Sequence, residues 1–276
     1  MKLKYLSAPY IVWMALFVVA PVIIVVVYAF TSAAGEFTFD NFAKMGGYVS
    51  VFSRSFLLAI ISTAICIIIG YPVAYILSKE RARQQRILIM LIMLPMWMNF
   101  LLRTYAWMSI LENTGLLNRL LTLLGLPAVN IINTPTAIVI GMVYNFLPFM
   151  ILPIYSVIVK IDRSLIEAAQ DLGANAVTVF RRVIFPLSLP GVFSGITMVF
   201  VPAVSTFVIS QLLGGGANML LGDLIEMQFL GAAYNPHLGS AIALVMMVIV
   251  MICMWLMNKF GAGGEEAALF ASNLYR

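Results

Sequence analysis

Charge is the scarcest property of this sequence. Only 10% of its 276 residues are Asp, Glu, Lys or Arg, whereas 63% are hydrophobic and the mean hydropathy is +1.04. A water-soluble domain carries about 25% charged residues, because its surface must be solvated. The composition therefore excludes a soluble globular enzyme, a disordered chain and a secreted disulfide scaffold, and it indicates an integral membrane protein.

Histidine and cysteine are nearly absent as well. His237 is the single histidine, and the two cysteines, Cys66 and Cys253, both lie inside apolar runs. A zinc site, a disulfide framework or a Ser-His-Asp triad needs more such residues at suitable spacing. We therefore expect two buried thiols, no metal site and no catalytic residues, which disfavours an intramembrane enzyme.

Long apolar runs are what the sequence has in abundance. A helix needs about 20 apolar residues to cross the roughly 30 Å hydrocarbon core of a bilayer. Six segments reach this length, and none shows the alternation of a membrane β-barrel. They cover about residues 9–30, 55–78, 87–110, 135–159, 189–211 and 239–258. We predict an all-α integral membrane protein with six transmembrane helices in one domain, residues 1–276.

The two ends of the chain need separate interpretation. The first apolar run exceeds the 7–15 residues typical of the core of a signal peptide, so we expect an uncleaved span. The last residues, 261–276, are small and polar, and they are interpreted either as a native tail or as a remnant added to the chain.

The basic residues divide unevenly between the two sides that these spans define. Four of the sixteen, Lys44, Arg54, Arg103 and Arg119, belong to one side or to the spans near it. The other twelve are Lys2, Lys4, Lys79, Arg81, Arg83, Arg86, Lys160, Arg163, Arg181, Arg182, Lys259 and Arg276. Short loops rich in Lys and Arg stay in the cytoplasm. We predict that both termini are cytoplasmic, and the net charge of +5 then requires no nucleic-acid partner.

The connection between the fourth and fifth spans, residues 160–188, carries the most specific pattern. Ser164 and Glu167 have the spacing of a helix capping box. Gly173 suits the left-handed end of that helix, and Asn175 suits the cap of a second short helix. The pattern predicts helix, glycine turn and helix on the cytoplasmic side. Taken alone, it is also typical of an amphipathic connector that lies at the membrane surface.

This loop resembles the EAA loop of permease subunits in bacterial ABC importers. It matches that motif at Glu167, Ala168, Ala169, Gly173 and Pro186. It departs at Val183 and Phe185, where the motif has isoleucine and leucine, and both replacements are apolar. In that family the loop is a coupling helix that docks on an ATP-hydrolysing subunit. The resemblance therefore implies ATPase coupling for the matched residues and for Ser164.

The same resemblance implies the rest of the assembly. No Gly-x-x-x-x-Gly-Lys-Ser/Thr phosphate-binding motif occurs in the chain, so ATP and Mg are expected on a partner and not here. The implied partners are a second permease subunit, different but similar, two ATP-binding subunits and an extracytoplasmic substrate-binding protein. The implied location is the bacterial cytoplasmic membrane, with this chain as a non-catalytic, multi-pass subunit.

Two further stretches, residues 95–107 and 214–229, resemble permeases of spermidine/putrescine importers in particular. The second stretch places a glycine triplet before Leu-Gly-Asp-Leu-Ile. The resemblance implies a polyamine as the solute. A permease for ferric ion, an anion or another organic amine is the main alternative, and a passive channel is a more distant one.

The charged candidates for the solute path are few. Arg103 lies within a span, with Asn99 one turn earlier, and it either lines the path, snorkels to the interface or pairs with an acid such as Glu112. Asp223 and Glu226 share one face of a short helix at a spacing of three residues. That face can meet an ammonium group, or it can be an ordinary solvated surface.

Aromatic residues complete the candidate path. Tyr105, Trp107, Tyr144 and Phe149 have faces that can bind a cation. The alternative for each is a place in the aromatic belt at the membrane interface.

Overall fold

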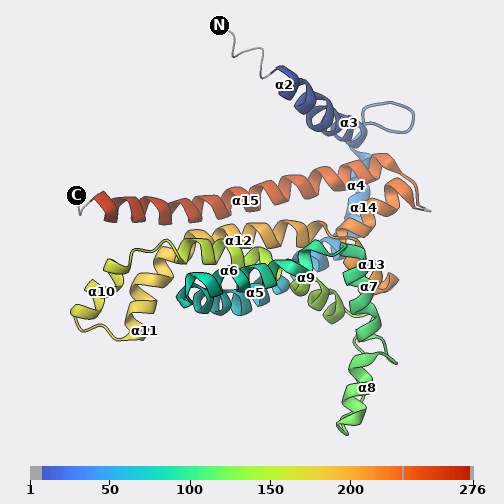
Figure 1. Ribbon diagram of the computed structural model, residues 1–276. Coiled ribbons are helices and arrows are strands. Elements are labelled where there is room, and N and C mark those ends of the chain that lie inside the picture. The colour runs from blue at the N-terminus through green and yellow to red at the C-terminus, as the bar shows by residue number, and fades with distance from the viewer. Residues whose placement is uncertain (1–7, 232, 274–276) are drawn as a thin grey trace.

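The computed structural model describes residues 8–231 and 233–273, and this part of the chain is helical, with no strand (Figure 1). An isolated bridge pairs Thr31 with Phe37. The α-helices are α2 (Ala8–Met14), α3 (Ala20–Ala29), α4 (Asp40–Lys44), α5 (Val49–Lys79), α6 (Ala82–Met93), α7 (Phe100–Leu111), α8 (Leu116–Leu123), α9 (Pro135–Ile158), α10 (Arg163–Asp171), α11 (Ala176–Val179), α12 (Phe185–Ser205), α13 (Val208–Gly214), α14 (Leu221–Leu230) and α15 (Pro236–Asn273).

The spans follow the predicted order. Five helical segments of the described chain are long and apolar enough to cross a membrane: Pro9–Ala29, Asp40–Lys79, Pro135–Ile158, Ala176–Ser205 and Pro236–Met257. A sixth crossing exists if the bent pair Ala82–Trp97 and Phe100–Leu123 counts as one span. The predicted all-α membrane fold is thus confirmed, and the third span differs from its prediction.

The third span is not one continuous helix. Its two halves meet at an angle of 89° between Trp97 and Phe100. Pro95 lacks the amide that would continue the helical ladder, and Met98 is extended. Asn99 then begins α7, because its side-chain oxygen accepts hydrogen bonds from the amides of the next turn, at 2.8 Å from Leu101 N. The predicted span over 87–110 is therefore present only if this bent pair is counted as one crossing.

The fifth span also has different bounds from those predicted. Helix α11, a π-helical turn at Phe180–Ile184 and α12 run on without a break from residue 176 to residue 205. The connecting loop is therefore shorter than the predicted 160–188. The span ends at Ser205 and not at residue 211, since the chain turns at Thr206 before α13 begins. Gly222 of α14 packs so closely on this turn that an added Cβ would lie 2.6 Å from the Thr206 carbonyl oxygen.

The core of the molecule surrounds α9, which lies between α5 and α12 (Figure 1). Met142, Met150 and Ile154 of α9 are fully buried there. Helix α15 contacts α12 on one side and α3 on the other. The first span has no buried residue in its apolar window.

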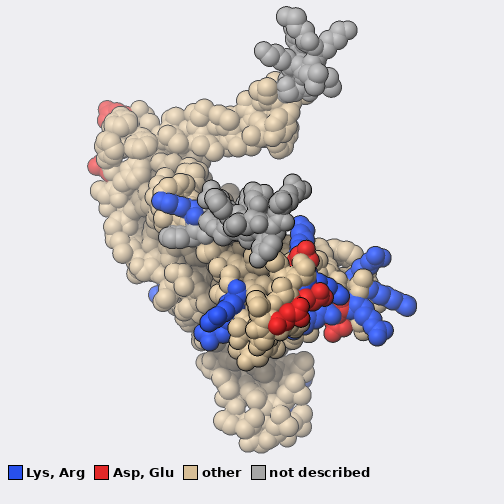
Figure 2. All heavy atoms as spheres, turned by 90° about the vertical axis from the view of Figure 1, so that its left-hand side faces the viewer, with Lys and Arg blue, Asp and Glu red and all other residues tan. Residues whose placement is uncertain are grey.

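The two ends of the bundle differ. Helices α10 and α11 lie at one end, and α13 and α14 lie at the other (Figure 1). Figure 2 shows the first end, where Lys and Arg side chains gather with fewer Asp and Glu side chains among them. That clustering is the pattern from which we predict a cytoplasmic location. The predicted tail continues α15 as far as Asn273, and residues 1–7 and 274–276 lie outside the described chain.

Candidate functional site

The connection between the fourth and fifth spans is called the coupling loop below, after the role that its resemblance to the EAA loop implies. Its predicted glycine turn is present between α10 and α11. Gly173 has φ +81°, a left-handed conformation that glycine adopts without steric cost. Its amide donates to Gln170 O at 2.8 Å, and the Ala174 amide donates to Ala169 O at 3.0 Å. This bond pair is the Schellman motif, so Gly173 ends α10 by satisfying carbonyls that would otherwise be orphaned.

The start of α10 differs from its prediction. Asp162 is the cap, and its Oδ1 accepts a hydrogen bond from Ser164 N at 3.0 Å. This bond from the Ser164 amide lowers the pKa of the Asp162 carboxyl. Ser164 lies inside the helix, so the predicted Ser164–Glu167 capping box does not form. Asn175 caps α11 as predicted, with Oδ1 accepting from Thr178 N at 2.9 Å.

The coupling loop presents an exposed face that mixes apolar and acidic side chains. Ile166 and Ala169 pack toward the hydrophobic core, whereas Glu167 and Ala168 are exposed. Leu172 is 89% exposed beside the glycine turn. Small and apolar side chains around one carboxylate, held on a capped helix, are suited to docking in a groove of another protein.

A cavity lies between the coupling loop and the helical bundle. This cavity of about 500 Å³ lies between α10 and the α5–α6 connection, with Lys79, Arg81, Arg163 and Ile166 in its lining. Helix α10 packs against α11 and against the π-helical turn that leads into α12. A displacement of α10 would thus pass directly into the fifth span.

The candidates on α7 and α9 form a separate group from those on α14. The rings of Trp107 and Tyr144 lie 5.2 Å apart in an edge-to-face arrangement, which joins the broken third span to the fourth. Tyr105 is 47% exposed on the outside of α7. Asn99 caps α7, so its position has a structural reason that is independent of any solute.

Arg103 is buried without an acidic partner. Its side chain is 8% exposed, and its Nε and Nη1 atoms have no hydrogen-bond partner. The predicted ion pair with Glu112 is not formed. The guanidinium lies 5.9 Å from the Phe100 ring, a weak cation–π contact. A buried guanidinium in this state calls for an acceptor from outside the described chain.

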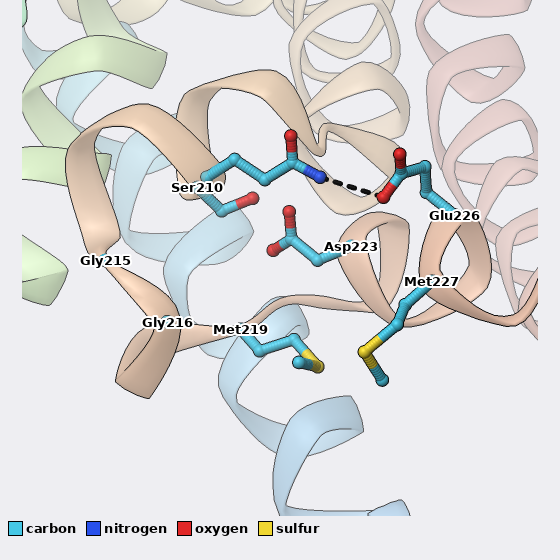
Figure 3. A pocket seen from close by; sticks show the side chains of 8 residues that line it. Ser210, Gly215, Gly216, Met219, Asp223, Glu226 and Met227 are labelled. Atoms are coloured by element: carbon cyan, nitrogen blue, oxygen red, sulfur yellow. Dashed lines mark hydrogen bonds between the residues drawn. The ribbon is translucent and has the colours of Figure 1, made fainter. Parts of the chain in front are cut away.

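Asp223 and Glu226 both belong to the short helix α14, and they line one pocket (Figure 3). The pocket has a volume of about 220 Å³ and lies between α13 and α14 beside the glycine triplet. Its lining is Ser210, Gln211, Gly215, Gly216, Met219, Asp223, Glu226 and Met227. No aromatic side chain is among them, so the aromatic candidates do not wall this site.

Hydrogen bonds hold both carboxylates in place. Asp223 Oδ2 accepts from the Leu220 amide at 2.7 Å and caps α14, and Glu226 Oε2 accepts from Gln211 Nε2 at 3.0 Å. Asp223 is 6% exposed, and its Oδ1 has no partner. Burial raises the pKa of the Asp223 carboxyl to about 6; the Leu220 amide and the nearby Ser210 hydroxyl oppose this shift, and the charge of Glu226 makes a smaller upward contribution.

Four other lining residues, Ser210, Gln211, Met219 and Met227, were not predicted. Gln211 stood at the end of a predicted span, where a polar residue signals the end of the apolar run. Ser210, Met219 and Met227 gave no signal, because only the packing of α13 on α14 brings them together. Asn145 was also missed; it is 2% exposed in α9, and its Oδ1 has no partner.

Some known proteins resemble this chain in sequence, and others resemble it in fold. Residues 66–262 match the family described as binding-protein-dependent transport system inner membrane component. The spermidine/putrescine transport system permease protein PotB of Escherichia coli K12 is 36% identical over 264 residues, covering 90% of this chain and 96% of its own. PotB of Haemophilus influenzae is 37% identical over 260 residues, covering 90% and 91%.

Solved structures with similar folds are chains of ABC transporters. A bacterial ABC transporter for the acidic polysaccharide alginate has a chain with a TM-score of 0.81 at 16% identity, with 94% of each chain covered. A chain of the MetNI methionine transporter in an inward-facing form has a TM-score of 0.58 at 18% identity, covering 78% of this chain and 95% of its own.

Proposed function

Because the chain belongs to the family of binding-protein-dependent transport system inner membrane components, we propose that it is the permease subunit of an ATP-driven polyamine importer. It is a multi-pass protein of the bacterial inner membrane. Relatives that are 36–37% identical across 90% of the chain are named as spermidine/putrescine permeases. This sequence similarity is the observation that favours a polyamine as the solute.

The proposed assembly has this chain as one half of the solute path. A second, similar permease supplies the other half, an extracytoplasmic binding protein delivers the solute, and two ATPase subunits drive the change of access. ATP and Mg belong to those ATPase subunits. Differential binding of ATP to one conformation of the motor supplies the free energy, and this non-catalytic chain transmits it.

The coupling loop is the part of this chain that would receive the motor's movement. Its face of Glu167, Ala168 and Leu172 is exposed, and α10 leads through α11 into the fifth span without a helical break after residue 176. A displacement of α10 by the ATPase would therefore be transmitted through α11 to α12, which move as one continuous helical segment. Because α12 packs against α9 at the centre of the bundle, a movement of α12 would also shift its contacts with the core.

Uptake of radiolabelled spermidine by the assembled importer tests this function. We expect Gly173→Pro and Glu167→Lys to abolish ATP-driven uptake and the stimulation of ATPase activity, while membrane insertion stays normal. Proline cannot adopt φ +81° and has no amide to donate to Gln170. Normal uptake and normal ATPase stimulation in both variants would contradict the coupling role.

Gly125 offers a matched control for Gly173. It has φ +74°, it has open space around its Cα, and its amide donates to Thr122 O at 3.1 Å after helix α8. Leu126 N donates to Leu121 O at 2.9 Å, so the same Schellman motif ends this helix. Gly125→Pro should cost similar local stability yet leave uptake coupled to ATP.

The solute and the mode of transport need separate measurements. Competition by putrescine, ferric ion, small anions and other organic amines distinguishes a polyamine importer from a permease for another solute. Flux of spermidine in the absence of the ATPase subunits would indicate a passive channel and contradict the proposal.

A further inference from the structure

The pocket between α13 and α14 offers hydrogen-bond acceptors and almost no free donors. Its two carboxylates, Asp223 and Glu226, face no Lys, Arg or His in the lining. The Ser210 hydroxyl donates to Phe207 O at 2.9 Å, and Gln211 Nε2 donates to Glu226. The side-chain donors of the pocket thus already have acceptors within the protein, and Figure 3 shows the bond that Glu226 accepts.

Asp223 Oδ1 is the atom that this arrangement leaves unsatisfied. The Asp223 side chain is 94% buried, as the complement of its 6% exposure. Its carboxylate lies in the pocket lining near Ser210 and Glu226 (Figure 3), and Oδ1 has no hydrogen-bond partner. Its sister oxygen Oδ2 is fixed by the Leu220 amide, so the carboxylate cannot rotate to find water without uncapping α14. An unpaired buried carboxylate oxygen is costly, and a positively charged donor is what would satisfy it.

Resting on the polyamine function proposed above, we infer that this pocket binds one primary ammonium end of the solute. An ammonium nitrogen between Asp223 Oδ1 and Glu226 would pair with both carboxylates. The side chains of Met219 and Met227 supply an adaptable apolar wall for the first methylene groups. A volume of about 220 Å³ admits one end of a polyamine and leaves the rest of the molecule outside.

The chemistry of the lining selects a primary amine over other cations. A trimethylammonium group has no N–H to give to Asp223 Oδ1, and the aromatic faces that usually hold it are missing from the lining. Among the described residues no group of three His, Cys, Asp or Glu side chains is placed to hold a metal ion. Two carboxylates alone are a weak site for a divalent cation.

Titration of the purified importer, with both permeases and the ATPase subunits but without the binding protein, tests the inference. The probes are putrescine, spermidine and a putrescine trimethylated on both nitrogens, which has no N–H donor at either end, and binding is measured by calorimetry. We expect Asp223→Asn to raise the dissociation constant for putrescine about 10- to 100-fold, as for loss of a charge-assisted bond. Trimethylated putrescine should bind wild type and variant equally weakly.

The variants are chosen so that folding and function stay separable. Asparagine at 223 keeps an oxygen for the Leu220 amide, and Glu226→Gln is a second variant in which the capping bond is untouched. Asp40→Asn, an exposed acid outside the pocket, is the matched control and should bind putrescine like wild type.

Three results would overturn the inference. They are unchanged putrescine affinity in both pocket variants, equal binding of the trimethylated probe, or Asp223-dependent binding of Mg²⁺ in place of amines. Wild-type uptake of spermidine with unchanged affinity in the pocket variants would reject the pocket alone, whereas absence of spermidine uptake in wild type would reject the proposed function.

Discussion

At the scale of single residues, Asp223 combines burial with one unpaired oxygen, and this combination makes amine binding depend on pH. Its pKa is raised from 3.8 to about 6, while Glu226, the other titratable lining residue, contributes its charge to that shift. The carboxylate attracts an ammonium group only when it is ionised. We expect putrescine affinity to be constant above about pH 7 and to fall roughly tenfold per pH unit below about 6.

Calorimetry of the purified importer between pH 5 and 8 measures this dependence. Asp223→Asn should remove the step near pH 6 and leave a flat, weak affinity. A wild-type affinity that does not change between these limits would contradict the shifted pKa. For the unliganded fold the sign is opposite: because the raised pKa penalises the charged form, Asp223 lowers the free energy of unfolding as the pH rises from about 4 to about 6.

At the scale of elements, the break in the third span depends on one cap. Asn99 accepts hydrogen bonds from Leu101 N and Leu102 N, at 2.8 and 3.4 Å, where α7 begins after the 89° bend. Loss of a capping Asn costs about 1 kcal/mol. We expect Asn99→Ala to lower the free energy of unfolding by about that amount, measured by denaturation of the purified protein in detergent, whereas Asn99→Asp should be close to neutral.

Asn113→Ala is the control for this prediction. Asn113 is exposed in the loop after α7, and its backbone carbonyl, which the substitution keeps, is the atom that accepts from Asn118. Equal destabilisation by Asn113→Ala and Asn99→Ala would mean that the cap is not what holds the bend.

The same elements show how far sequence reasoning reaches. The glycine turn at Gly173 was predictable, because a left-handed helix end depends on local residues alone. The position and the angle of the break before Asn99 were not predicted, because an apolar run of about 20 residues indicates a span without defining the path of the chain inside it. Asp162, two residues before the predicted cap Ser164, was an equally good cap, and local preference could not decide between them.

At the scale of the whole molecule, the number and order of spans were predictable and the pocket was not. Apolar runs of about 20 residues indicate where the chain crosses the bilayer, because every crossing helix needs such a run whatever helices it packs against. Asp223 and Glu226 share a pocket with Gln211 only because α14 folds back onto α13, with Gly222 allowing the close approach to the end of α12. That contact depends on tertiary packing, which periodicity does not encode.

The orientation of the molecule is the remaining prediction at this scale. The concentration of Lys and Arg at the end that carries α10 and α11 predicts that this end is cytoplasmic (Figure 2). Two leucines report on the two ends: Leu172, 89% exposed beside α10, and Leu230, 82% exposed at the end of α14. Each is changed to cysteine in a background in which Cys66 and Cys253 are replaced by alanine.

A membrane-impermeant maleimide added to intact spheroplasts should label Leu230→Cys and spare Leu172→Cys. In cells that lack the ATPase subunits, which the proposed docking would place over Leu172, opening the membrane should make both positions reactive, because their exposed fractions are nearly equal. Labelling of Leu172→Cys in intact spheroplasts, with Leu230→Cys protected, would reverse the orientation. The coupling loop would then face away from any cytoplasmic ATPase, and the proposed transmission through α10 into α12 could not operate.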